Sequence, residues 1–172
     1  MQEEKIIDCY LNKLDSVSDE ASVPALIEEM VNDPDMFWFG EILDHPKVSD
    51  STGTLSLLAY GEWVGGCHQN LSEIAKQKLK KLTILSAFLE FGPAKPIPFD
   101  HLLARAGLED EIQLFRTLLS MTQLVSVRID ELSRTVRLVT LHTARDVPPG
   151  KVPAVMESLS NLKQRVHSFI NS

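Results

Sequence analysis

The sequence has few residues of the kinds that build metal centres or disulfide frameworks. It contains two cysteines, far apart and without a CxxC spacing, and five histidines, at positions 45, 68, 101, 142 and 167. None of these histidines forms an HxH, HExxH or ExxH pattern, although zinc sites draw their ligands from such closely spaced groups. We therefore expect no metal site, and reduced thiols in a cytosolic or nuclear protein.

Catalytic motifs are missing as well. Gly61, Gly65 and Gly66 are not followed by the Lys and Ser/Thr of a phosphate-binding loop, and no GxGxxG occurs. Cys67 and His68 are adjacent, and because adjacent side chains usually point apart, we expect an inert thiol there rather than a catalytic dyad. The sequence predicts neither an enzyme nor a bound cofactor.

Long apolar runs and a surplus of basic residues are also absent. No apolar run approaches the ~20 residues of a membrane span, and the start, Met1 to Lys5, lacks the pattern of a signal peptide. The 17 basic residues stand against 24 acidic ones, which gives a formal net charge of −7. Phosphate backbones and anionic membranes repel such a chain. We expect a soluble intracellular protein that binds neither nucleic acid nor membrane.

What the sequence does have is regularly spaced apolar residues, 44% of a 172-residue chain, which is enough for a packed core. Helical spacing begins near Ile6, resumes after the N-cap candidate Ser22 and again at Leu55. The longest predicted helix spans 71–91, with Ser72 as its N-cap, and we assign its lysines to a solvated face rather than a basic patch. They are Lys76, Lys78, Lys80 and Lys81. These helices predict a helical-repeat subdomain of the HEAT or TPR kind over residues 1–91.

Residues 92–143 predict a winged helix, because two short helices precede a hairpin. The first helix ends at Gly107, and the second opens with three acids at 109–111. We expect the second helix to bury Ile112, Phe115, Leu118, Leu119 and Thr122. Apolar residues then alternate on either side of a polar turn at 131–135, as strand residues do. They are Val125, Val127 and Ile129 before the turn, and Val136, Leu138 and Thr140 after it.

This winged helix has little charge with which to grip DNA. Residues 97–141 carry six acidic and five basic side chains and no lysine, whereas non-specific DNA affinity comes mainly from phosphate neutralisation. A DNA-reading alternative remains, since the predicted outward face of the second helix carries groups able to contact base edges. They are Gln113, Arg116, Thr117 and Ser120. The charge balance favours a protein-docking module.

Residues 144–172 predict a linker and one more helix. Its apolar residues are spaced four, three, four and three apart, which is the a/d seam of a coiled coil. They are Val155, Leu159, Leu162, Val166 and Phe169. Two interpretations stay open: the seam docks on a partner, or the helix packs back on its own domain. We predict two interaction surfaces, the strand edges of the hairpin, which can pair with a neighbour's strand, and this seam.

Several strings resemble one known family. They are FWFGEILDHPKV (37–48), LLAYGEW (57–63), KLKKLTILSAF (78–88), IPFDHLL (97–103) and ARDVPPGKV (144–152). In this order they resemble PCI domains, and within those the subunit-seven family of the COP-nine signalosome, whereas the wing at 126–138 departs from the family. PCI domains are shared with the proteasome lid and translation initiation factor three, which remain alternatives.

The resemblance implies a mainly α-helical fold, in which a helical-repeat bundle precedes a winged helix with a small antiparallel β-hairpin sheet and a C-terminal helix. It implies a non-catalytic scaffold in the complex that removes Nedd8 from cullins, whose peptidase is a different subunit. The partners implied are other PCI subunits at the winged-helix edge and further subunits at the C-terminal helix. The resemblance implies a location in nucleus and cytoplasm.

Overall fold

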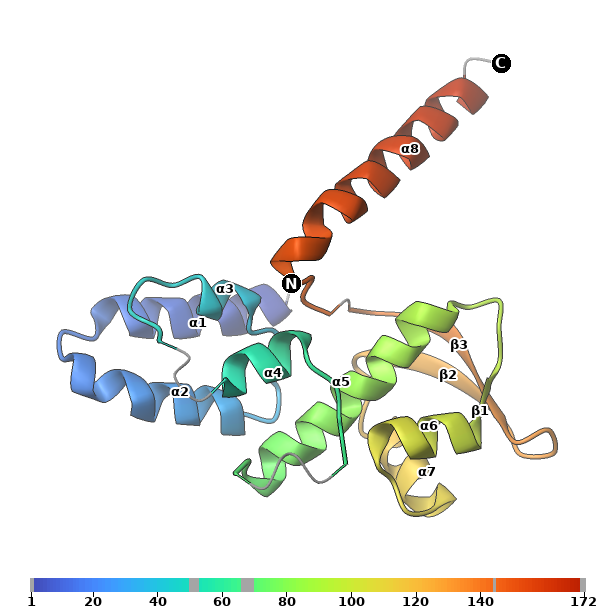
Figure 1. Ribbon diagram of the computed structural model, residues 1–172, viewed down its shortest axis with the longest axis horizontal. Helices are drawn as coiled ribbons and strands as arrows, with labels where there is room; N and C mark the ends of the chain where they lie inside the picture. The colour runs from blue at the N-terminus through green and yellow to red at the C-terminus, as the bar shows by residue number, and fades with distance from the viewer. Residues whose placement is uncertain (1, 50–52, 66–69, 144, 171–172) are drawn as a thin grey trace.

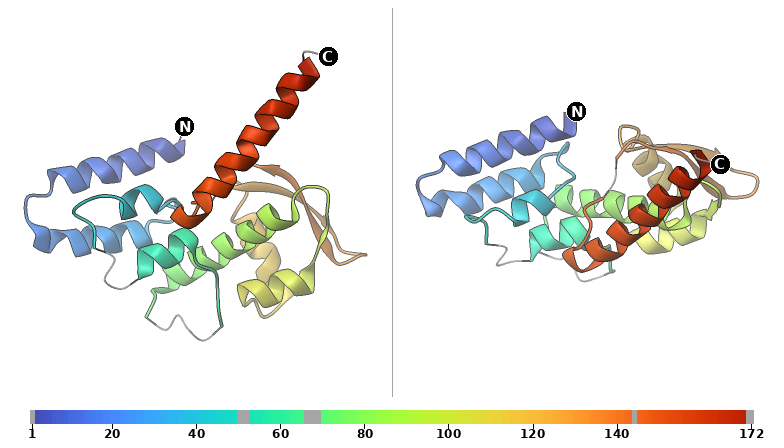
Figure 2. Two further views of the ribbon diagram at one scale, coloured as in Figure 1. Left: turned by 45° about the horizontal axis from the view of Figure 1, so that its top comes forward. Right: turned by 90° about the horizontal axis from the view of Figure 1, so that it is seen from above.

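The computed structural model describes residues 2–49, 53–65, 70–143 and 145–170. The N-terminal helices gather at one end of the molecule, and the winged helix forms the other end, with the long helix α5 running between them (Figure 1). The last helix, α8, projects away from both parts in Figure 1 and in the left view of Figure 2. The predicted fold class is confirmed: the chain is mainly helical with a small antiparallel sheet and a C-terminal helix. None of the described helices is both long and apolar enough for a membrane span.

Within the described residues, five α-helices and one 3-10 turn precede the winged helix. They are α1 (Gln2–Ser16), η1 (Glu20–Ser22), α2 (Val23–Asn32), α3 (Gly40–Leu43), α4 (Thr54–Tyr60) and α5 (Glu73–Phe91). The Ser72 side chain accepts a hydrogen bond from the Ala75 N–H, so its predicted N-cap role at α5 is confirmed. Ser22 does precede α2, but its side chain forms no cap hydrogen bond. After α2, an apolar cluster is buried at Phe37, Phe39 and Ile42.

The sequence predicted that the lysines of α5 share one solvated face. In the structure they do not. Lys78 is only 3% exposed, and its ammonium donates to the carbonyls of Met30, Val31 and Asp33 at 3.3, 2.8 and 2.7 Å. These carbonyls lie at the C-terminal end of α2, where a helix leaves acceptors unsatisfied and favours a positive charge. One buried cation therefore joins α2 to α5, and the prediction for Lys78 is wrong.

The winged helix follows the predicted order, with one strand added. Its elements are β1 (Ile97–Pro98), α6 (Phe99–Ala106), α7 (Glu111–Leu119), β2 (Val125–Asp130) and β3 (Thr135–Leu141). Gly107 ends α6 in the left-handed region at φ 59°, as its place in the sequence predicted. A Cβ there would lie 2.0 Å from Nε1 of Trp63. The glycine thus allows the turn after α6 to pack directly on the segment that follows α4.

The buried face of α7 differs from the prediction. Leu114 and Leu118 are buried, whereas Ile112 and Leu119 are 60% and 70% exposed and Thr122 is exposed as well. Phe115 is half-buried, with its ring edge-on to that of Phe99. The sequence offers two apolar stripes with helical spacing, and the packing of α7 on the core selects the one that continues into Met121 and Leu124.

The three strands lie in the order β1-β3-β2, all antiparallel. β3 is therefore the middle strand, and Val136 pairs with Ile129 on one side and with Ile97 on the other. A bulge leaves Val139 of β3 as an extra residue between the pairs Ser126–Thr140 and Val127–Leu138, so the alternation expected for Val136, Leu138 and Thr140 breaks before Thr140, which is exposed. Val125 is buried, Val127 half-buried and Ile129 exposed.

The buried residues form one continuous core across the helical and winged-helix parts. It includes Leu14 and Phe39 from the first part and Phe99, Leu118 and Val136 from the second. The boundaries expected at 91/92 and 143/144 stay a prediction, because a shared core gives no break at which to test them. The chain ends with η2 (Pro149–Lys151) and α8 (Val152–Ile170).

Candidate interaction surfaces

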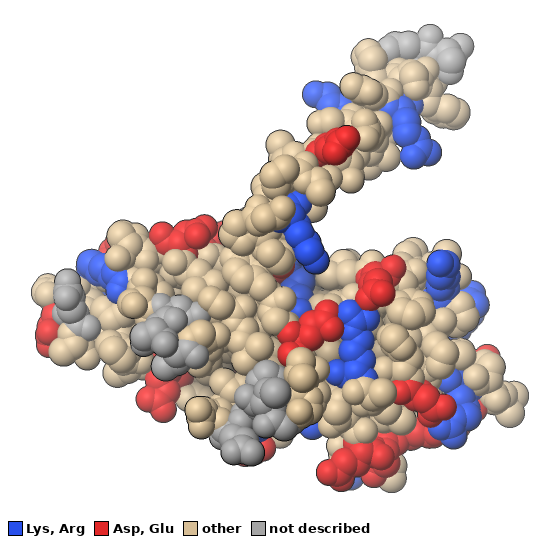
Figure 3. All heavy atoms as spheres, in the orientation of Figure 1, with Lys and Arg blue, Asp and Glu red and all other residues tan. Residues whose placement is uncertain are grey.

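Helix α8 carries its apolar seam entirely in solvent. None of its residues is buried, and Val155, Leu159, Leu162 and Val166 are each 40–55% exposed, with Phe169 at 83%. The seam is widened by neighbouring exposed residues Val152, Met156 and Ile170. Figure 3 shows the helix as a largely uncharged rod with a few charged side chains. In the structure, therefore, this helix does not pack back on its own domain, which was the other interpretation left open by the sequence.

A shallow hollow lies along the outer half of this seam. It is lined by Leu159, Leu162, Val166 and Ile170, with Lys163 and His167 at its rim, and encloses about 370 Å³. Hollows between side chains of an a/d seam are where the side chains of a facing helix insert in a coiled coil. The geometry suits a helical partner.

The predicted strand-edge residues do not form one surface. Val125, Val136 and Leu138 are buried in the chain's own core, and Val127 is half-buried, which leaves Ile129 and Thr140 exposed. Because β3 is the middle strand and Val136 is paired on both sides, that residue offers no open edge. The outer edge of β2, and β3 beyond its short pairing with β1, are the backbone edges available for a neighbour's strand.

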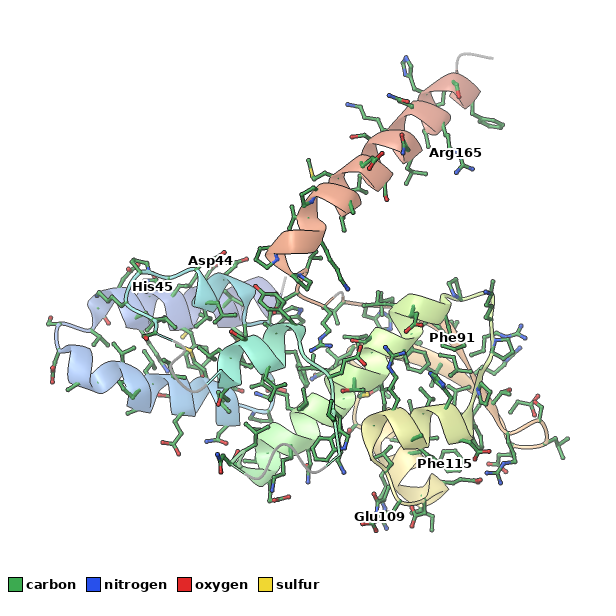
Figure 4. All side chains as sticks on the ribbon, in the orientation of Figure 1. Asp44, His45, Phe91, Glu109, Phe115 and Arg165 are labelled. Atoms are coloured by element: carbon green, nitrogen blue, oxygen red, sulfur yellow. The ribbon has the colours of Figure 1, made fainter. Side chains whose placement is uncertain are left out.

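An apolar surface that sequence analysis missed lies between α7 and the wing. Leu132, at the wing tip, is fully exposed. It borders a hollow of about 500 Å³ with Phe115 and Ile129 as further apolar lining. Ile112 and Leu119 add exposed apolar area on α7, where Figure 4 labels Phe115. Grouped exposed apolar residues commonly mark interaction sites. The wrong phase assigned to α7 hid Ile112 and Leu119, and the prediction of a polar turn hid Leu132.

The face of α7 considered for base reading borders a groove with α5, and its Arg116 and Ser120 are exposed. Gln113, Arg116, Thr117 and Ser120 line a groove shared with the first half of α5. The acids at the start of α7 have local roles: the Asp110 carboxylate accepts from the Gln113 N–H as N-cap, and Glu111 pairs with Arg134 at 2.7 Å. Arg134 also contacts Asp100 at 3.1 Å. The wing arginine is thus held by carboxylates of α6 and α7.

The segment between the winged helix and α8 is clamped to the helical part. Asp146 accepts hydrogen bonds from the N–H groups of Phe39, at 2.7 Å, and Gly40, at 3.1 Å, where α3 begins. Burial raises the pKa of the Asp146 carboxyl. The Arg145 guanidinium donates to Ser86 Oγ and to the carbonyls of Leu58 and Gly61. This clamp fixes the point from which α8 leaves the molecule.

Comparison with known proteins finds two relatives that carry the same name. No protein-family model matches the chain. A Drosophila melanogaster protein named COP9 signalosome complex subunit 7 is 27% identical over 154 residues, covering 81% of this chain and 54% of that protein. A Dictyostelium discoideum protein of the same name is 22% identical over 152 residues, covering 81% of this chain and 58% of that protein.

The chain resembles subunit 7 of the COP9 signalosome. The resemblance predicted from the sequence strings is therefore confirmed, at modest identity. The chain spans about half the length of the curated relatives it matches. Because the match covers 81% of this chain, the similarity to these subunit-7 proteins extends beyond its winged helix.

Proposed function

We propose that this chain is a non-catalytic scaffold subunit of a COP9 signalosome, supporting the removal of Nedd8 from cullins by holding other subunits together. The observation that carries the proposal is the solvent-exposed apolar seam of α8. Most helical stability in proteins comes from the packing of an amphipathic face, and the exposed apolar stripe of α8 gains free energy when a partner covers it. The names of the two relatives supply the assembly.

The proposal gives each surface a partner. Further signalosome subunits would cover the seam of α8, and a neighbouring PCI subunit would pair with the open strand edges of the winged helix, next to the apolar group around Leu132. The clamp of Arg145 and Asp146 supports this division, because it holds the base of α8 against the helical part and so fixes one surface relative to the other. The chain would act in nucleus and cytoplasm.

A pull-down of the tagged chain from its source cell, with mass spectrometry of what co-purifies, tests the proposal. We expect the other signalosome subunits and cullins with the wild type and with Gln164→Asp, a control on the opposite side of α8 from the seam. Leu162→Asp should lose them, because the seam would receive a charge. Co-purification of proteasome-lid or initiation-factor subunits instead would assign the chain to a sister assembly.

A winged-helix nucleic-acid binder is the second candidate, and the structure favours it less. Its wing arginine, Arg134, is already paired with Asp100 and Glu111, and the helix face considered for base reading borders a groove with α5. Phosphate contacts would have to overcome a net charge of −7. Recovery of chromatin proteins alone, released by raising the salt concentration, would favour this candidate over the scaffold.

A further inference from the structure

A groove between α5 and α7 gathers positive charge in an otherwise acidic protein. It encloses about 420 Å³, and four cationic side chains line it, namely Lys76, Lys80, Lys81 and Arg116. One carboxylate, Glu73, also lines it, and this group already pairs with Lys76 at 2.7 Å. The groove is therefore locally positive, although the chain as a whole carries a net charge of −7.

One of these cations, Lys80, is held in place before any ligand arrives. The Lys80 ammonium donates to the Gly107 carbonyl at 2.9 Å and lies 4.7 Å from the centre of the Trp63 ring. The ring and the backbone therefore hold this side chain across the groove. A cation that is already ordered loses less conformational entropy on binding an anion.

Lys81 stands at the edge of the same groove and is only half exposed. Burial lowers the pKa of its ammonium, and the charge of Asp35 offsets part of this effect. A desolvated cation of this kind gains more from an added carboxylate than a fully hydrated one, because the local dielectric is lower. Arg116 faces it from α7 and is exposed, so a ligand would contact both walls.

We propose that this groove binds an acidic peptide segment of another protein, with its carboxylates on Lys76, Lys81 and Arg116 and apolar atoms on Trp63 and Leu108. Trp63 and Leu108 supply apolar lining between the charges, which suits a peptide with mixed acidic and apolar side chains. The inference does not depend on the assembly to which the chain belongs, since it rests on the groove alone.

A peptide fits this groove better than a nucleic acid does. Glu109, next to the groove, is hydrogen-bonded to the Gln113 side chain that lines it, and Asp110 and Glu111 follow. A nucleic acid tracking beyond the groove would meet these carboxylates, whereas a short peptide is confined between the cations.

Fluorescence anisotropy with the whole chain tests the proposal. The probe is a fluorescein-labelled octapeptide of sequence EELEELEE, titrated at low salt. The double variant Lys76→Glu with Arg116→Glu should weaken binding by about tenfold or more, since two attractions become repulsions. The matched control, Lys95→Glu with Arg137→Glu, makes the same change of charge at exposed positions outside the groove and should bind within about twofold of the wild type.

Further measurements make the result decisive. The milder pair Lys76→Gln with Arg116→Gln should also weaken binding, and thermal unfolding of all variants excludes misfolding as the cause. An equal loss in the control pair would overturn the proposal, because binding would then follow net charge alone. No binding of the probe would overturn it as well. Tighter binding of an octamer of deoxythymidylate, lost in the same groove variants, would assign the groove to nucleic acid instead.

Discussion

The Lys78 ammonium donates a 2.8 Å hydrogen bond to the backbone carbonyl of Val31, so a side chain of α5 caps the C-terminal end of α2. The same ammonium lies 5.2 Å from the centre of the Phe39 ring, which connects it to the segment before α3. A single buried side chain of α5 therefore contacts both the end of α2 and the segment before α3, and removing it leaves acceptors rather than only a cavity.

Lys78→Met should destabilise the chain by about 2–3 kcal/mol, because buried carbonyls at the end of α2 lose their hydrogen-bond donor. Urea unfolding followed by circular dichroism measures this change. Lys76→Met is the matched control, since Lys76 pairs with the exposed Glu73, and it should cost less than about 1 kcal/mol. Equal losses would show that Lys78 has no special structural role.

The same residue predicts a pH dependence. Burial lowers the pKa of Lys78 from 10.5 to about 7, so between these values the unfolded chain binds a proton that the folded chain has lost. The free energy of unfolding should therefore rise with pH above about 7. Measured between pH 7 and 9.5, the rise should be smaller in Lys78→Met. Identical slopes in the two proteins would contradict the assignment.

Gly107→Ala should destabilise the chain strongly. The residue lies at φ 59°, a region that costs an L-residue about 1–2 kcal/mol, and the new methyl group would overlap the Trp63 ring. We expect a total loss of about 3 kcal/mol or more. Gly150→Ala is the control, because nothing lies within 4 Å of its Cβ position. Thermal unfolding compares the two variants, and a harmless Gly107→Ala would show that Trp63 moves aside freely.

Asp146→Ala should cost about 1–3 kcal/mol, because the N–H groups of Phe39 and Gly40 lose their acceptor. Asp146→Asn should cost less, since its amide oxygen can still accept both hydrogen bonds. Limited proteolysis adds a local measurement, with faster cleavage between 144 and 152 expected for Asp146→Ala. An unchanged cleavage rate in that variant would mean that other contacts hold the segment.

Leu162→Asp should leave the stability of the isolated chain within about 0.5 kcal/mol of the wild type, because the side chain is exposed. The same substitution is expected to abolish assembly in the cell. Thermal unfolding of the monomer, compared with Gln164→Asp, separates the two effects. A large loss of stability in the monomer would show that the seam belongs to the chain's own core.

Local signals predicted the ends of helices well. Ser72 and Gly107 act within one turn of the helix that they start or end, so their roles can be predicted from the neighbouring residues alone. The strand β1 could not be predicted in this way. Its two residues are too few to show a period. They pair with Val136 and Thr135 of β3, a strand that follows much later in the chain.

Tertiary packing decided what local signals left open. The buried face of α7 was chosen between two stripes of equal spacing, with Leu114 on one and Ile112 on the other. Nothing near Lys78 in the sequence indicates that it meets carbonyls 45–48 residues earlier in the chain. The seam of α8 was predicted as a pattern, but only the structure shows that its residues lie in solvent.

The contacts of Asp146 have a consequence for synthesis of the chain on the ribosome. The N–H groups of Phe39 and Gly40, at the start of α3, share one acceptor, Asp146, which lies 107 and 106 positions later in the chain. A nascent chain that has released its helical repeats must still complete the winged helix before this contact can close, and contacts so distant in sequence slow folding. The base of α8 can therefore be fixed only after the chain has been synthesised through Asp146, so the docking helix has no fixed base while the helices before it are being made.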